Sequence, residues 1–391
     1  MRSNSKKVQW QQVSTGFLSS LMAIIAGLVF GLIILVIVNP NQAIPGFLRI
    51  LTGGFGNSWQ GFGKVINYAV PIIMTGLSVG FAFRTGLFNI GASGQFMVGA
   101  YTAIYIGYSV KGLPAPWHWL LAFICASLAG AIWGAVPGLL KAYRNVNEVI
   151  SSIMMNYIGL YLVNFLIPMT VYDKIKNQTK SVLKTARTPT LGLNKLLPKS
   201  NLDIAIFVVL LAVIVLYIIT KKTTFGFELR ACGLNREAAR YAGINEKKSI
   251  TYSMLIAGIF SGMGGALLYL SHTGTYMQVK DELLMQGFNG IPVALLGLSH
   301  PIGIFFSGLF ISHITIGGNY MQAYDFPVEI IDMIIAAIIY FGAFALLFRQ
   351  FFTRRLTRRA SLALADEPSP ATQGGGVDES KTVHVDKEDH V

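Results

Sequence analysis

The sequence is poor in cysteine and shows no pattern of residues that would hold a metal. Its 391 residues include two cysteines, Cys125 in an apolar run and Cys232 in a loop, and neither belongs to a CxxC pair. His272, His300 and His313 lack metal-ligand spacing. A disulfide framework and a Cys/His zinc site are therefore excluded, and we expect no metal in this chain.

Charged residues are also scarce, at 13% of the chain against 53% hydrophobic residues, and the mean hydropathy is +0.55. This balance excludes an ordinary soluble surface and indicates that a lipid bilayer is the solvent. The net charge of +13 does not indicate nucleic-acid binding, because the basic residues mostly flank apolar runs. There they fix the orientation of the spans in the membrane. The first apolar run, 16–38, is too long for a signal-peptide core and should remain as an anchor.

Apolar runs long enough to cross a hydrocarbon core of roughly 30 Å recur along the chain. They predict an all-α, polytopic transmembrane bundle that occupies residues 17–348 and has about ten spans. The expected spans are 17–38, 62–83, 86–108, 117–140, 149–170, 202–220, 250–271, 283–299, 301–320 and 328–348.

An even number of spans places both termini on one side, and Lys and Arg are more abundant on that side, so the termini are predicted to be cytosolic. The N-terminal segment 1–16, the loop 221–249 and the basic clamp and disordered tail at 349–391 are then cytosolic. The external loop 171–201 is an exception to the charge rule, with seven cations and one acid. It is expected to contact either anionic lipid or cell-surface polymer, or an acidic lobe of an external partner.

The cytosolic loop contains a segment that is far less apolar than its flanks and should form a short helix. Glu237, Ala238 and Ala239, followed by Gly243, resemble the loop signature of ATP-binding-cassette importer permeases. A rigid helix with small contacts and charged sides suits docking into a cleft of an ATPase subunit, and Gly243 would end that helix. The alternative interpretation is a solvated amphipathic loop helix.

Two apolar segments are interrupted by glycine and carry uncharged amides. The first, at 84–100, contains Asn89, Gln95, Phe88 and Phe96. Such a break within the membrane lets one helix unwind or lets helices approach closely. Amides at this depth either join helices or face a polar pathway, and the pattern leaves both alternatives open.

The second interrupted segment, at 287–297, combines Gly, Phe288, Asn289 and a proline in an unusually short span. One interrupted segment in each half of the chain indicates a central site built from paired elements. A third amide, Asn156, lies about 12 Å along the helix from Glu148 at 1.5 Å per residue. Capping by Asn147 and dipole complementarity explain Glu148 but not Asn156, which is therefore a pathway candidate.

From about Val65 to Phe348 the chain resembles the branched-chain amino acid, sugar and nucleoside permease family of ATP-binding-cassette importers. The resemblance rests on residues 86–95, 147–156, 237–243 and 293–297. The Asn-Glu-Val-Ile sequence at 147–150 looks like the nucleoside branch rather than the ribose branch. Asn289 and Pro292 depart from that branch, where relatives tend to show Asp and Ala.

The resemblance implies a multi-pass permease of the bacterial plasma membrane that forms a pathway for nucleosides. It also implies a second, often unlike, permease chain, an ATP-binding-cassette ATPase subunit that holds ATP-Mg, an external substrate-binding lipoprotein and surrounding lipid. The chain lacks a G-x-x-x-x-G-K-[ST] phosphate loop, so we expect no cofactor in it and no catalytic role. The alternatives are a simple-sugar (ribose-type) import permease and an ion-coupled secondary transporter, although the latter should show acids deep inside spans.

Overall fold

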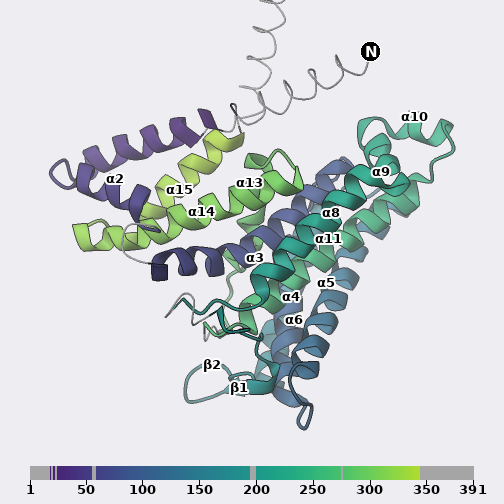
Figure 1. Ribbon diagram of the computed structural model, residues 1–391. Helices are drawn as coiled ribbons and strands as arrows, with labels where there is room; N and C mark the ends of the chain where they lie inside the picture. The colour runs from purple at the N-terminus through teal and green to yellow at the C-terminus, as the bar shows by residue number, and fades with distance from the viewer. Residues whose placement is uncertain are drawn as a thin grey trace, which may run out of the picture. The chain divides into compact units, whose positions relative to one another are not determined.

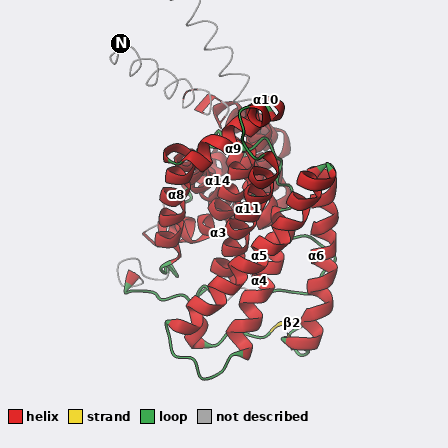
Figure 2. Ribbon diagram, turned by 90° about the vertical axis from the view of Figure 1, so that its right-hand side faces the viewer, coloured by secondary structure: helices red, strands yellow, loops and turns green. Residues whose placement is uncertain are grey.

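The computed structural model describes residues 18, 21–22, 24–54, 59–193, 200–273 and 276–343. The N-terminal segment 1–16 and the clamp and tail at 349–391 lie outside these residues. Within them the protein is helical apart from one two-stranded hairpin, as Figure 1 and Figure 2 show.

An apolar helix, Ile24–Val38, precedes the labelled elements. In chain order these are α2 (Ala43–Thr52), α3 (Trp59–Arg84), α4 (Ala92–Ser109), α5 (Trp117–Arg144), α6 (Glu148–Thr170), β1 (Tyr172–Asp173), β2 (Gln178–Thr179), η1 (Lys184–Ala186), α8 (Ala205–Lys222), α9 (Thr224–Leu234), α10 (Arg236–Tyr241), α11 (Glu246–Tyr269), α12 (Met285–Phe288), α13 (Gly290–Leu296), α14 (Pro301–Met321), η2 (Gln322–Tyr324) and α15 (Val328–Ala343).

Six of the described helices are long and apolar enough to cross a membrane, which agrees with a polytopic bundle. They include α3, α5, α6, α8 and α11, and the sixth extends α14 to Tyr324. The count of ten spans and the cytosolic placement of the termini stay predictions.

The structure interrupts two of the predicted spans. The helix expected at 86–108 begins only at Ala92, after a turn in which Gly86 has a φ of +70°. The span expected at 283–299 is not continuous, because α12 and α13 contain four and seven residues and meet at Asn289. At 1.5 Å per residue, neither piece crosses about 30 Å.

Helix α11 is the centre of the described bundle and packs on α5, α4 and α3. Close backbone contact at glycines permits this packing. A Cβ added to Gly99 would lie 2.5 Å from Gly262 Cα, and one added to Gly258 would lie 2.2 Å from the Gly130 carbonyl oxygen. Side chains larger than hydrogen would therefore push these helices apart.

The termini of two helices follow the sequence prediction. Asn147 caps α6 by accepting hydrogen bonds from the N–H groups of Val149 (2.9 Å) and Ile150 (3.4 Å). Glu148 lies in the first turn and pairs with Lys141 of α5 at 2.9 Å. Capping and dipole complementarity at this terminus are confirmed.

The hairpin and the α9–α10 segment lie at opposite ends of the bundle (Figure 1). The sequence places the loop 171–201 and the loop 221–249 on opposite faces of the membrane, and the fold is consistent with that assignment.

Candidate functional site

The first interrupted segment is held by a reciprocal pair of amides. Asn89 Nδ2 donates to Gln95 Oε1 at 3.0 Å, and Gln95 Nε2 donates to Asn89 Oδ1 at 3.0 Å. Asn89 Nδ2 also donates to Ser78 Oγ of α3 at 3.1 Å. Both amides are buried, so their polar groups are satisfied within the protein.

Asn156 caps α4 from a different helix. The N–H of Gly94, in the first turn of α4, has no acceptor within its own helix and donates to Asn156 Oδ1 at 2.8 Å. Asn156 Nδ2 donates to the Ile90 carbonyl at 3.0 Å. Because the N-cap residue is Gly91, which has no side chain, the amide from α6 replaces a local cap.

The structure brings the two interrupted segments into contact, while a central site between them stays a prediction. Ser93 Oγ of α4 donates to the Leu284 carbonyl at 2.9 Å, and Thr75 Oγ1 of α3 donates to the Gln286 carbonyl at 3.0 Å. Gly287 packs so closely that an added Cβ would lie 2.3 Å from Ser93 Cα. The short helix α12 is therefore anchored to the beginning of α4 and to the middle of α3.

The remaining predicted pathway residues differ in exposure. Phe96 is fully buried in an apolar cluster with Leu160 of α6. Phe88 is half-buried and stacks on Phe83, with ring centroids 5.4 Å apart. Phe288 and Asn289 are half-buried at the break between α12 and α13. The side-chain amide of Asn289 makes no hydrogen bond to another described residue. A pathway role for these residues stays a prediction.

The predicted docking helix exists as α10, at the end of the bundle (Figure 1). Glu237 and Ala238 are exposed, whereas Ala239 is buried. Gly243 ends the segment as predicted, with a φ of +82°; its N–H donates to the Arg240 carbonyl at 3.0 Å.

Sequence analysis missed two residues of this surface. Leu234, the last residue of α9, and Tyr241, the last residue of α10, lie on either side of the Glu-Ala-Ala sequence and are 89% and 91% exposed. The available signal was a large apolar side chain on each side of the polar sequence 235–237 in a loop that is far less apolar than its flanks. Together with Glu237 and Ala238 they form a surface, hereafter the coupling surface, with the composition of a protein contact.

The α9 helix contacts the turn that leads into the first interrupted segment. A Cβ added to Gly233 would lie 2.5 Å from the Arg84 carbonyl oxygen and 3.0 Å from Gly86 N. Arg84 Nε in turn donates to the Ser299 carbonyl at 3.0 Å, in the turn after α13. The turn at Arg84 therefore contacts both the loop that carries the coupling surface and the end of the second interrupted segment.

A buried polar cluster closes the opposite end of the bundle. Asp203 Oδ1 accepts from the Ala205 N–H at 3.0 Å, its other oxygen accepts from the Thr188 hydroxyl, and His272 Nε2 contacts the Thr188 carbonyl at 2.8 Å. Among the described residues, no three His, Cys, Asp or Glu side chains converge to hold a metal.

Comparison with known proteins places this chain in a family. The family model for the branched-chain amino acid transport system / permease component matches residues 61–343. A guanosine ABC transporter permease protein, NupP of Bacillus subtilis (strain 168), is 40% identical over 324 residues, which cover 83% of this chain and 92% of that protein.

Two further relatives differ in what their names say they transport. A nucleoside ABC transporter permease protein, NupB of Lactococcus lactis subsp. cremoris (strain MG1363), is 34% identical over 328 residues, covering 83% of this chain and 89% of that protein. A glucose ABC transporter permease protein, TsgB13 of Haloferax volcanii, is 30% identical over 369 residues, covering 90% and 93%. No solved structure matches the chain significantly.

Proposed function

The chain belongs to the family of branched-chain amino acid transport system permease components, and from this premise we propose that it forms the translocation pathway of an ATP-driven importer for nucleosides. It is a membrane-spanning, non-catalytic permease subunit, and ATP hydrolysis takes place in a separate partner subunit. The observation that carries the choice of substrate is the identity to guanosine and nucleoside permeases over more than four fifths of both chains.

The proposed complex contains further parts. We assign to it an ATPase that binds ATP-Mg, a second permease chain that is not identical to this one, an external substrate-binding lipoprotein and the lipid of the plasma membrane. The present chain would bind no cofactor of its own.

The pathway is proposed to run along the contact between the two interrupted segments. A nucleoside is neutral at pH 7 and has hydroxyls, base-edge donors and acceptors and a flat face. The side-chain amide of Asn289 has no hydrogen-bond partner among the described residues, so it is available to a substrate. Phe288 and Phe88 offer half-buried aromatic faces. We assign Asn89, Gln95, Asn156 and Phe96 to the wall of the pathway, where their buried contacts fix its shape.

Transport of labelled substrate by the assembled transporter tests the proposed substrate. Vesicles that contain the permeases, the ATPase and the lipoprotein are expected to accumulate guanosine or uridine only with ATP, and excess unlabelled nucleoside should compete. Ribose and glucose serve as the competing sugars, because the identity to a glucose permease favours a sugar as the second candidate. If the vesicles instead accumulate labelled glucose with ATP, and nucleosides do not inhibit this accumulation, the substrate class is sugars rather than nucleosides.

Coupling is proposed to pass from the coupling surface through Gly233 to the turn at Arg84. Gly233→Ala places a Cβ 2.5 Å from backbone that cannot move cheaply, and such overpacking typically costs about 1–3 kcal/mol. The variant should insert and assemble, but nucleoside should stimulate its ATP hydrolysis several-fold less. Gly159→Ala is the matched control, since Gly159 is also a helical glycine and a Cβ there meets only the Trp133 side chain, at 3.3 Å or more. Normal stimulation in Gly233→Ala would show that this contact does not transmit movement.

A further inference from the structure

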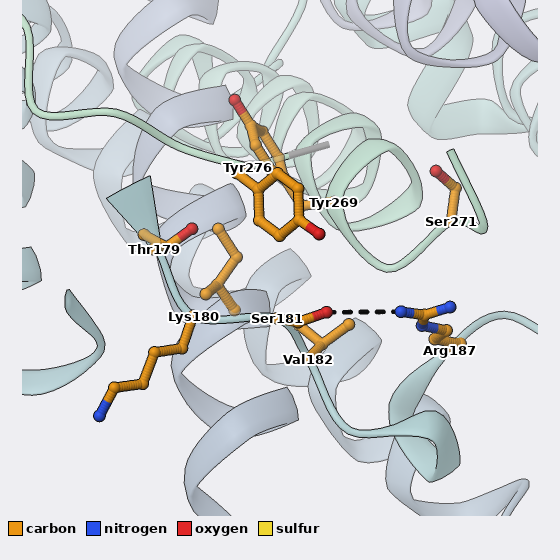
Figure 3. Close-up of a pocket in the computed structure, with 9 residues that line it drawn as sticks. Thr179, Lys180, Ser181, Val182, Arg187, Tyr269, Ser271 and Tyr276 are labelled. Carbon is orange, nitrogen blue, oxygen red and sulfur yellow. Dashed lines mark hydrogen bonds between the residues drawn. The ribbon is translucent and has the colours of Figure 1, made fainter. Parts of the chain in front are cut away.

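A small pocket lies at the end of the bundle opposite the coupling surface (Figure 3). One wall is the chain after β2, including Ser181 and Arg187, and another is the end of α11 with Tyr269 and Ser271. Tyr276, from the segment that follows, closes a third side. The polar groups that line this space are hydroxyls, one ammonium and one guanidinium.

Arg187 and Tyr269 bring donors that the protein itself does not satisfy. Arg187 Nη2 reaches Ser181 Oγ at 3.4 Å, which is a long hydrogen bond, and its buried Nε has no hydrogen-bond partner among the described residues. Tyr269 is 5% exposed, and its hydroxyl makes no hydrogen bond to another described residue. Figure 3 shows the Arg187 guanidinium directed toward Ser181, with the overlapping rings of Tyr269 and Tyr276 on the opposite side of the pocket.

The pocket has no acid to balance these donors. Its lining includes the cations Arg187 and Lys180 and contains neither Asp nor Glu. The Lys180 ammonium donates to the Tyr108 hydroxyl at 3.2 Å and lies 5.0 Å from the centre of that ring, so it contributes charge rather than a free donor. Buried donors without acceptors are costly, and beside two cations the acceptor that binds most strongly carries negative charge.

The loop that carries Arg187 is fixed in place before any ligand arrives. The Thr179 N–H donates to the Met277 carbonyl at 2.8 Å, and the Leu183 N–H donates to the Gly107 carbonyl at 2.9 Å. The Thr188 N–H, one residue after Arg187, donates to the Leu270 carbonyl at 3.0 Å. A ligand therefore does not have to order the site, which favours binding.

We propose that this pocket binds one oxyanion, a carboxylate or a phosphate, between the Arg187 guanidinium and the Tyr269 hydroxyl. The favoured source is an Asp or Glu side chain of the external lipoprotein, and this source rests on the proposed function. Exposed Lys174 and Lys176 on the same loop would attract an acidic surface toward the pocket.

A lipid headgroup is the less favoured source because of where the pocket lies. It opens at the ends of α4 and α11, and α11 is the central helix of the bundle. Most of the exposed apolar side chains that suit contact with acyl chains lie on the outer helices, such as α5, α6 and α8, although Ile175 on the same loop is also exposed.

Binding of inorganic phosphate to the purified, detergent-solubilised chain tests the pocket itself. Tyrosine fluorescence and the unfolding temperature are followed against phosphate at constant ionic strength, with chloride as the reference anion. Arg187→Gln should weaken phosphate binding about tenfold, as expected for loss of a charged hydrogen bond. Lys176→Gln, which removes the same charge from the same loop outside the pocket, should change it less than twofold. Tyr269→Phe removes a single hydroxyl, should weaken binding severalfold, and carries the test if Arg187→Gln does not fold.

A second measurement separates the sources of the oxyanion. If a protein carboxylate occupies the pocket, Arg187→Gln weakens lipoprotein affinity of the assembled importer about tenfold, and Lys176→Gln has a small effect that salt removes. If Arg187→Gln weakens phosphate binding but leaves lipoprotein affinity unchanged, the pocket binds a free anion. An Arg187 effect that appears only in nanodiscs of phosphatidylglycerol, and not of phosphatidylcholine, overturns the protein source in favour of lipid. If Arg187→Gln, Tyr269→Phe and Lys176→Gln behave alike in every assay, the pocket binds no oxyanion. The phosphate arm requires only this chain, so its failure is distinct from failure of the proposed transport function.

Discussion

The same substitution at Asn156 and at Asn289 should have opposite effects on assembly and turnover. Asn156→Leu removes two hydrogen bonds, of 2.8 Å to the Gly94 N–H and of 3.0 Å to the Ile90 carbonyl, and leaves both backbone groups buried without a partner. Polar contacts between membrane helices are worth about 0.6–2 kcal/mol each, and an unpaired buried group costs about 1–3 kcal/mol. We therefore expect a loss of about 1–4 kcal/mol, a large fraction of the roughly 5–15 kcal/mol that stabilises a typical domain.

Asn289→Leu removes no hydrogen bond within the described residues and changes a half-buried side chain, so it should leave stability almost unchanged. Its expected effect is severalfold slower nucleoside-stimulated ATP hydrolysis per assembled complex, because the pathway loses a donor and an acceptor. Asn289→Asp should be tolerated, since the resemblance to the nucleoside branch implies an Asp at this position and Asp keeps the size of Asn.

Assembly and turnover have to be measured on the same preparations. Size-exclusion chromatography and the unfolding temperature report the folded complex, and ATP hydrolysis with and without nucleoside reports coupling. The reasoning is refuted if Asn156→Leu assembles normally but does not turn over, or if Asn289→Leu loses turnover only in proportion to lost complex. The first result would move Asn156 from the wall to the pathway, and the second would make Asn289 part of the scaffold.

Ala238→Trp adds bulk to the exposed coupling surface and should abolish uptake while membrane insertion stays normal; substrate-driven ATP hydrolysis at the wild-type rate would contradict docking at this residue. In otherwise cysteine-free protein, Lys184→Cys should react with an impermeant thiol reagent from outside the cell and Arg236→Cys only from inside, and the reverse pattern would refute the ten-span topology.

Much of the fold could be predicted from the sequence because its signals are local. Long apolar runs fix where helices cross, since each span must satisfy its own backbone hydrogen bonds in lipid. The cap at Asn147 and the helix end at Gly243 depend on residues within a few positions of one another, and both are confirmed. The glycines and the proline around Asn289 likewise indicated an interrupted helix, although the hydropathy of 283–299 alone predicted a continuous one.

The sequence by itself indicated a membrane permease, two broken segments and a short helix in the loop 221–249; the cytosolic side of that loop and its docking role stay predictions. Only the tertiary structure decided which side-chain amides are already hydrogen-bonded within the protein. Asn156 caps a helix 62 residues away, and the Arg84 turn meets Gly233 of a different segment. Hydrophobic periodicity shows which side of a helix is apolar but not which polar group another helix brings to it. Gln95 and Asn289 therefore look alike in sequence. In the packed bundle they differ, because the Gln95 side chain is hydrogen-bonded to Asn89 and the Asn289 side chain has no partner among the described residues.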